Sequence, residues 1–187
     1  MKLTNVETNL LGIFTDEVAL DNLEKIKLVH GWRLITTEAT KLVAMYCVAF
    51  LAGCFFETFL VHFSFFFFRQ VAYGIHSKNY LTCLVISCIT FPFSAFLINN
   101  GEVAPLSIWV IYSISALLLM LLAPIGSSIN NIRGPLHARY LRRKMYSRLC
   151  ILGVTLLFIP STITKFLVVG LLIETIAVMV AFIKKED

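Results

Sequence analysis

The chain has 187 residues, of which 58% are hydrophobic and 14% charged, and its mean hydropathy is +0.84. A soluble domain carries about 25% charged and about 45–50% apolar residues. A soluble globule of this length is therefore excluded, and the composition indicates an integral membrane protein. The length favours one domain over residues 1–187, and the net charge of +5 is distributed so unevenly that it predicts how the chain is oriented.

Residues 1–41 are predicted to form amphipathic helices at the cytoplasmic membrane interface. Thr4 and Glu7 have the spacing of a capping box, and apolar residues then recur at helical intervals between charged ones. Gly31 is expected to end one of these helices. The segment lacks the short apolar core of a cleavable signal peptide, so we expect it to be retained.

The apolar runs predict an all-α polytopic bundle. Two runs approach the ~20 residues that cross a ~30 Å hydrocarbon core, namely Tyr80–Ile98 and Leu106–Ala123. Two others, Leu42–Phe68 and Leu149–Ile183, are longer than one crossing needs. Each is either one tilted span or two segments, with a break near Gly53, as in a re-entrant hairpin, or near Pro160. We therefore expect four to six membrane-embedded helical segments.

The connectors differ in charge. Asn99–Pro105 holds no lysine or arginine, whereas Ile125–Arg148 holds no acidic residue and six basic ones, namely Arg133, Arg139, Arg142, Arg143, Lys144 and Arg148. Basic connectors stay on the cytoplasmic side. Residues 125–148 are therefore predicted to form a basic cytoplasmic loop, and residues 69–79 face the same side. Any chemistry is expected at the inner face of the membrane.

Residues 69–83 contain the combination that thiolate chemistry needs. Cys83 begins an apolar run directly after a polar stretch with His76, so a thiol, an imidazole and water can meet there. On one straight helix the two residues would be ~10.5 Å apart along the axis. The chain must therefore break between them, and Gly74 permits this. If Asn79 caps the next helix, the helix dipole favours the Cys83 thiolate.

Other interpretations of these residues remain open. Cys83 can be a small buried hydrophobic residue, and His137 with Cys150 or His62 with Cys54 are rival pairs, ranked below His76 and Cys83. Arg69 either holds a substrate carboxylate or anchors a span at the headgroups. Ser87 shares a helical face with Cys83 and either supports catalysis or packs within the span. The basic residues of 133–148 dock either a peptide or anionic lipid.

The order of these residues resembles the accessory gene regulator B (AgrB) family over nearly the whole chain. The shared features are Arg69, the run Ala72 to Lys78, Cys83 and Ser87, the pair Ala123-Pro124, and the basic segment with Asn131 and Gly134-Pro135-Leu136. Relatives often carry two glycines before the histidine, and Tyr73 occupies the first of these places. No acidic residue is an obvious third catalytic member, so the resemblance implies a dyad.

The resemblance implies a membrane-embedded cysteine endopeptidase of Gram-positive bacteria. Cys83 would attack an AgrD-type quorum-sensing propeptide, with His76 as base and then acid, and a thioester on Cys83 would close into a thiolactone or lactone ring. It implies no cofactor or metal and no nucleic-acid partner, and as partners the propeptide, membrane lipids and a second copy in a homodimer. The implied location is the plasma membrane, with the active site facing the cytoplasm.

With this resemblance, the chain divides into the interfacial segment 1–41, a catalytic helical region 42–98 and the remaining spans 99–187. Two non-catalytic functions remain as alternatives. One is a small permease or exporter of peptides, in which Glu57, His62 and Glu174 mark a path through the membrane. The other is a membrane scaffold whose basic loop recruits lipid or a partner.

Overall fold

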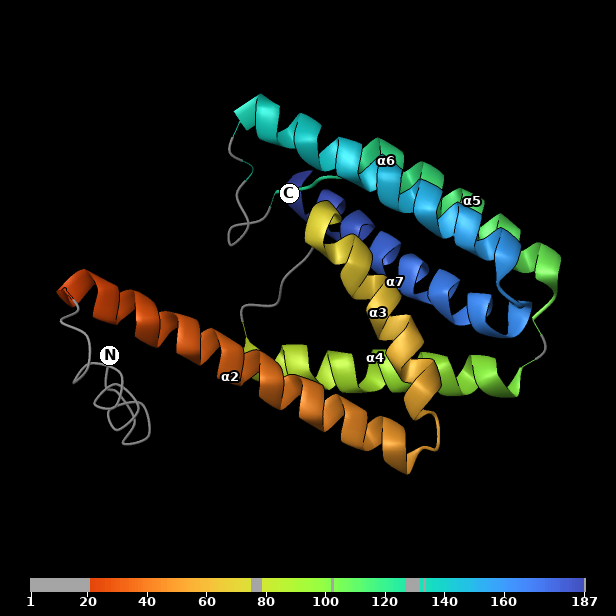
Figure 1. Cartoon of the computed structure of the whole chain (residues 1–187), viewed down its shortest axis with the longest axis horizontal. Helices are drawn as coiled ribbons and strands as arrows, with labels where there is room; N and C mark the ends of the chain where they lie inside the picture. Colours follow the sequence, from red (N-terminus) through yellow and green to blue (C-terminus); the bar gives the residue numbers. More distant parts are fainter. Residues whose placement is uncertain (1–20, 75–78, 102, 127–131, 133, 187) are drawn as a thin grey trace. The chain divides into compact units, whose positions relative to one another are not determined.

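The computed structural model describes residues 21–74, 79–101, 103–126, 132 and 134–186. Over these residues the secondary structure is helical apart from short connections and one isolated bridge between Tyr73 and Ile125. The helices are α2 (Asn22–Leu51), α3 (Phe55–Ala72), α4 (Tyr80–Asn100), α5 (Pro105–Leu122), α6 (Gly134–Phe158) and α7 (Ser161–Glu186), as labelled in Figure 1. The predicted all-α class is confirmed. The capping box and the apolar stripe of residues 4–18 lie outside the described residues.

Among the described helices, four are long and apolar enough to cross a membrane, namely Leu23–Leu51, Tyr80–Asn100, Pro105–Leu122 and Ser161–Lys184. The helices α3 and α6 are also long, but they interrupt their apolar residues with charged ones. The predicted membrane-protein class is confirmed, and the count of four agrees with the lower limit of the expected range.

Both long apolar stretches break at the positions that the sequence marked. Gly53 lies between α2 and α3 and has a φ of +69°, which glycine adopts at no steric cost. Pro160 lies between α6 and α7 and has no N–H with which to continue the hydrogen-bond ladder of α6. Each stretch is therefore two helices rather than one tilted span.

Helix α2 runs through Gly31, so the expectation that a helix ends there is wrong. One interior glycine costs a helix about 1 kcal/mol relative to alanine, and the leucine, lysine and arginine residues on either side are good helix formers. The chain divides between Ala44 and Met45 into two units. Helix α2 therefore contributes residues to both.

Within the unit Met45–Asp187, α7 packs most extensively on α3, beside which it lies in Figure 1, and then on α5. Gly170 permits the closest approach, because a Cβ there would lie 2.2 Å from the carbonyl oxygen of Val61. Nearby, Ser64 Oγ donates a 2.6 Å hydrogen bond to the Leu167 carbonyl. Small residues of this kind allow membrane helices to pack closely.

The helix termini of this unit gather at two ends. At one end, the N–H of Ile125, just after α5, donates a 3.2 Å hydrogen bond to the Ala72 carbonyl at the end of α3. At the other end, Lys165 Nζ near the start of α7 donates a 2.9 Å hydrogen bond to the Ile98 carbonyl near the end of α4. The connectors after α3 and α5 therefore share one end, and the connector 99–105 lies at the opposite end.

The basic stretch that we expected to be a loop is helical from Gly134 onward. Beneath its charges, buried apolar residues recur at helical intervals along α6, namely Leu141, Met145, Leu149, Leu152 and Leu156. The stripe packs α6 against its neighbours, and this burial overrides the local excess of charge.

Candidate active site

Cys83 lies in the first turn of α4, as predicted. Its backbone N–H donates a 3.1 Å hydrogen bond to the carbonyl of Asn79, which occupies the N-cap position with extended backbone. Asn79 is thus the N-cap residue, although its side chain makes no capping hydrogen bond within α4. The Cys83 side chain is half-buried. Cys83 therefore lies at the positive end of the α4 dipole.

Ser87 lies one turn after Cys83, and both side chains are half-buried. The same four-residue spacing continues to Phe91 and Ala95, which are buried in the core cluster that includes Val61 of α3. Residues at this spacing share one helix face. Cys83 and Ser87 therefore lie on the face of α4 that turns toward α3.

Helix α3 ends at Ala72, and Tyr73 and Gly74 follow with φ values of +68° and +70°. Asn79, which lies between the two predicted catalytic residues, has extended backbone (φ −98°, ψ 124°), and α4 begins after it at Tyr80. A single straight helix from His76 to Cys83 is therefore excluded. His76 itself lies outside the described residues, as do Ile75, Ser77 and Lys78.

The backbone at Tyr73 is unusual for a residue with a side chain. Its φ of +68° and ψ of −82° form a conformation that glycine adopts far more readily than residues with a Cβ. Tyr73 keeps the turn through the bridge to Ile125 and the adjacent hydrogen bond from Ile125 to Ala72.

Arg69 turns inward, toward α7. Its Nη1 lies 3.6 Å from Oε2 of Glu174 on α7, whose side chain is fully buried. The guanidinium also lies 5.9 Å from the centroid of the Phe65 ring. Gly74 is packed against both elements, because a Cβ there would lie 2.6 Å from Arg69 Nη1 and 3.3 Å from the backbone of Ala177.

In the sequence analysis, Glu174 belonged to the transport path of the exporter alternative. An acidic residue within an apolar membrane helix is expected to have a partner. Its partner could not be identified from the sequence, because Arg69 is far away along the chain.

Four of the five predicted docking residues are described by the structure, and all four are exposed. Arg139, Arg142, Arg143 and Lys144 are exposed on α6, whereas Arg133 lies outside the described residues. Arg148 is half-buried and serves the end of α3, where it donates hydrogen bonds to the Phe67 carbonyl and, at 2.9 Å, to Gln70 Oε1. A cation at this position also complements the negative end of the α3 dipole. Docking by the four exposed residues stays a prediction.

The geometry excludes both rival pairs. His137 and Cys150 lie on the same helix, α6, with about 20 Å between them along the axis. Cys54 immediately precedes α3 and His62 lies within it, about 12 Å further along the axis. His62 Nδ1 is instead 3.0 Å from the Tyr46 hydroxyl.

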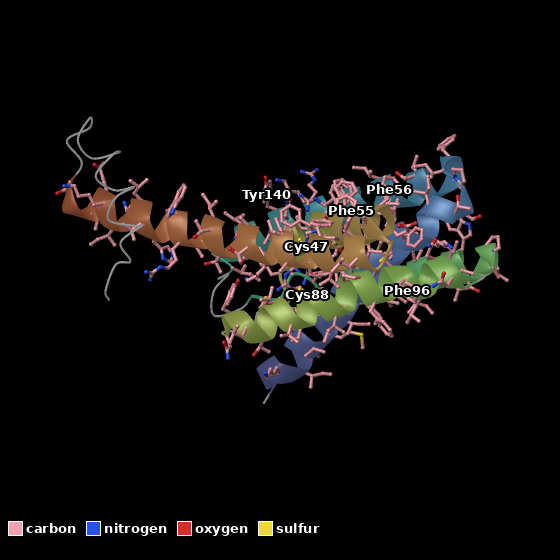
Figure 2. The ribbon with its side chains drawn as sticks, turned by 90° about the horizontal axis from the view of Figure 1, so that it is seen from below. Cys47, Phe55, Phe56, Cys88, Phe96 and Tyr140 are labelled. Atoms are coloured by element: carbon pink, nitrogen blue, oxygen red, sulfur yellow. The ribbon has the colours of Figure 1, made fainter. Side chains whose placement is uncertain are left out.

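The other cysteines have settings that do not suit a nucleophile. Cys54 is buried, with its sulfur 3.6 Å from both the Thr58 hydroxyl and the Pro92 carbonyl oxygen. Cys47 and Cys150 are exposed but lie in helix interiors, and Cys88 is half-buried in the middle of α4; Figure 2 labels Cys47 and Cys88. Across the described part of the chain, no three His, Cys, Asp or Glu residues gather as a metal site would require.

Comparison with known proteins shows which family the sequence matches. The sequence model of accessory gene regulator B matches residues 8–178, which include every candidate residue named above. The accessory gene regulator protein B of Staphylococcus saprophyticus is 27% identical over 90% of this chain and 88% of its own length, and that of Staphylococcus aureus is 26% identical over the same shares. An AgrB-like protein of Listeria innocua is 27% identical over 82% of this chain and 76% of its own. No solved structure matches.

Proposed function

The chain belongs to the accessory gene regulator B family, and from this premise we propose that it is a membrane-embedded cysteine endopeptidase acting on an AgrD-type quorum-sensing propeptide. The observation that carries the proposal is the location of Cys83. Its thiol is half-buried in the first turn of α4, a few residues after the turn at which the chain leaves α3. A nucleophilic thiol needs a helix N-terminus or a comparable positive charge, partial access to water and a nearby base.

In the proposed reaction, the Cys83 thiolate attacks a carbonyl carbon near the carboxyl end of the propeptide. The peptide C–N bond breaks, His76 gives a proton to the leaving amine, and the propeptide remains on Cys83 as a thioester. A cysteine or serine side chain of the same peptide then attacks the thioester, His76 accepts its proton, and the Cys83 sulfur leaves. A thiolactone or lactone ring results.

The ring closure explains why such a site would lie at the membrane. A thioester is replaced by another activated ester, so bond energy is conserved and no nucleotide is required. Excluding water would favour attack by the peptide side chain over hydrolysis. Because basic residues of α6 gather at the end of the bundle where α3 and α5 terminate, we place the reaction at the cytoplasmic face.

The same basic face of α6 is proposed to dock the substrate or anionic lipid. Arg139, Arg143 and Lys144 are exposed there, and an acidic propeptide tail carries the complementary charge. A homodimer in the membrane of a Gram-positive bacterium is carried over from the family resemblance.

Cys83→Ala tests the proposal. We expect propeptide cleavage to fall by about 10⁴-fold or more, because removing a covalent nucleophile removes the acyl-enzyme route. His76→Ala should cause a loss of the same order. Cleavage is measured by mass spectrometry after co-expression with an AgrD-type propeptide, normalised to the amount of inserted protein.

Cys88→Ala is the matched control, since it removes a second half-buried thiol from the same helix. It should retain cleavage. If Cys83→Ala cleaved the propeptide as the wild type does, the proposed cysteine peptidase function would be refuted. The alternative of a peptide exporter, which needs no nucleophile, would then be favoured.

A further inference from the structure

Glu174 is an acidic residue that is fully buried within an apolar helix. Its side chain is 0% exposed, and among the described residues neither carboxylate oxygen accepts a hydrogen bond. Its ion-pair partner is Arg69, whose Nη1 lies 3.6 Å from Oε2. A carboxylate buried in a membrane helix is costly unless it is paired, and a pair of well-packed apolar residues would hold two helices together at lower cost. The ion pair is therefore better explained by a role in positioning than by stability.

The pair lies directly against the turn by which the chain leaves α3. The Arg69 carbonyl accepts a 3.2 Å hydrogen bond from the Tyr73 N–H, so Arg69 belongs to the last turn of the helix. The Arg69 guanidinium occupies the space beside Gly74, where a Cβ would approach Nη1 to 2.6 Å. The same Cβ position would lie 3.3 Å from the Ala177 backbone, about one turn after Glu174 on α7. Gly74 thus lies close to both the arginine and the helix that carries the glutamate.

Few residues separate this turn from the helix that carries Cys83. Only residues 75–79 separate Gly74 from α4, and five residues span at most about 18 Å even when fully extended. A change in the direction of the chain at Gly74 therefore cannot be absorbed by a long linker.

We propose that Glu174 is a positioning residue, which holds Arg69 beside the Tyr73–Gly74 turn and thereby fixes the point from which the chain continues to the proposed catalytic residues His76 and Cys83. Glu174 does not touch the substrate and takes no part in proton transfer. The proposal rests on the proposed cysteine peptidase function and assigns to that site a support on α7.

Glu174→Gln keeps the size of the side chain and removes its charge. We expect kcat for propeptide cleavage to fall by about 10-fold or more while KM changes by less than about 3-fold, since a displaced base affects the chemical step and not substrate binding. Glu174→Asp should retain more activity than Glu174→Gln, because it keeps the charge. Glu57→Gln is the matched control, being the same change at the opposite end of α3, and it should leave kcat unchanged.

A second readout separates positioning from a merely structural role. The rate at which iodoacetamide alkylates Cys83 at neutral pH reports how much thiolate is present, and peptide mapping distinguishes Cys83 from exposed Cys150. We expect Glu174→Gln to slow Cys83 alkylation to within about 2-fold of the rate in His76→Ala, with Cys150 alkylated as in the wild type.

Wild-type kcat in Glu174→Gln would overturn the proposal. So would a lower kcat with Cys83 alkylated at the wild-type rate, because the glutamate would then only stabilise the fold. The proposed function fails by a different result, namely continued cleavage by Cys83→Ala. The two failures are therefore distinguishable.

Discussion

Tyr73 and Gly74 are two consecutive residues with positive φ, and they differ in what this costs. Glycine adopts the conformation freely, whereas a residue with a Cβ in the left-handed region loses roughly 1–2 kcal/mol. Tyr73 adopts the conformation despite this cost, and the bridge to Ile125 fixes its backbone. At Gly74 an added Cβ would lie 2.6 Å from Arg69 Nη1 and 3.3 Å from the Ala177 backbone, so a side chain would meet both strain and a steric clash.

Gly74→Ala is therefore expected to reduce propeptide cleavage by about 10-fold or more, since the new Cβ displaces the Arg69 guanidinium and presses on the Ala177 backbone. Gly53→Ala is the control, because Gly53 has a φ of +69° but a Cβ added there would have no atom within 4 Å. Both variants should lose about 1 kcal/mol of stability from backbone strain. Only Gly74→Ala should lose cleavage, measured by mass spectrometry of the propeptide. Equal cleavage by the two variants would contradict a special role for the Gly74 contacts.

At this scale, the sequence predicted the features that depend on neighbouring residues. The polar stretch before Cys83 indicated a new helix start, and the distance that His76 must cover required a break. The partner of Arg69 could not be predicted, because charge attraction does not depend on sequence order and two acidic residues, Glu57 and Glu174, lie in the apolar stretches.

At the scale of helices, the packing of α3 on α7 positions the Arg69–Glu174 pair. Gly170 brings the two backbones together near Val61 and Ser64, one to two turns before Arg69 along α3. Arg148 of α6 then holds the end of α3 through the Phe67 carbonyl and Gln70. The end of α3 is thus fixed from two sides, by α7 and by α6.

Gly170→Ala should destabilise the protein by about 1–3 kcal/mol, because the Cβ would lie 2.2 Å from the Val61 carbonyl oxygen and 2.9 Å from the Phe65 nitrogen, which are backbone atoms that cannot rotate away. Gly31→Ala has no atom within 4 Å of its Cβ position and should stabilise α2 by up to about 1 kcal/mol. Thermal unfolding in detergent measures both. A Gly170→Ala protein as stable as the wild type would contradict the close helix contact.

The helix boundaries show when local sequence signals are sufficient. Gly53 and Pro160 lie between helices, which is one of the two alternatives that the sequence left open, because one combines a positive φ with a turn and the other has no N–H to donate. Gly31 did not end a helix, since an isolated glycine costs less than the surrounding turns contribute. The basic stretch of α6 was expected to be a loop because it carries many charges. It is helical because the apolar stripe from Leu141 to Leu156 is buried against the neighbouring helices.

At the scale of the whole molecule, several polar groups of the apolar stretches have partners within the bundle. His62 pairs with Tyr46, Glu174 with Arg69, and Lys165 with the Ile98 carbonyl. Groups that line a transport path would instead have to exchange partners with the cargo. The alternative of a peptide exporter therefore receives little support from these residues, and the test on Cys83 separates it from the peptidase.

The most direct test of the proposed peptidase function is mass spectrometry of the protein after it has been quenched during turnover with an AgrD-type propeptide. Acid quenching followed by peptide mapping should find Cys83 carrying the propeptide without its carboxyl-terminal tail, as a thioester that hydroxylamine removes. The adduct should be absent from Cys83→Ala. An acyl group on another cysteine, or ring formation that proceeds without an adduct on Cys83, would contradict the account.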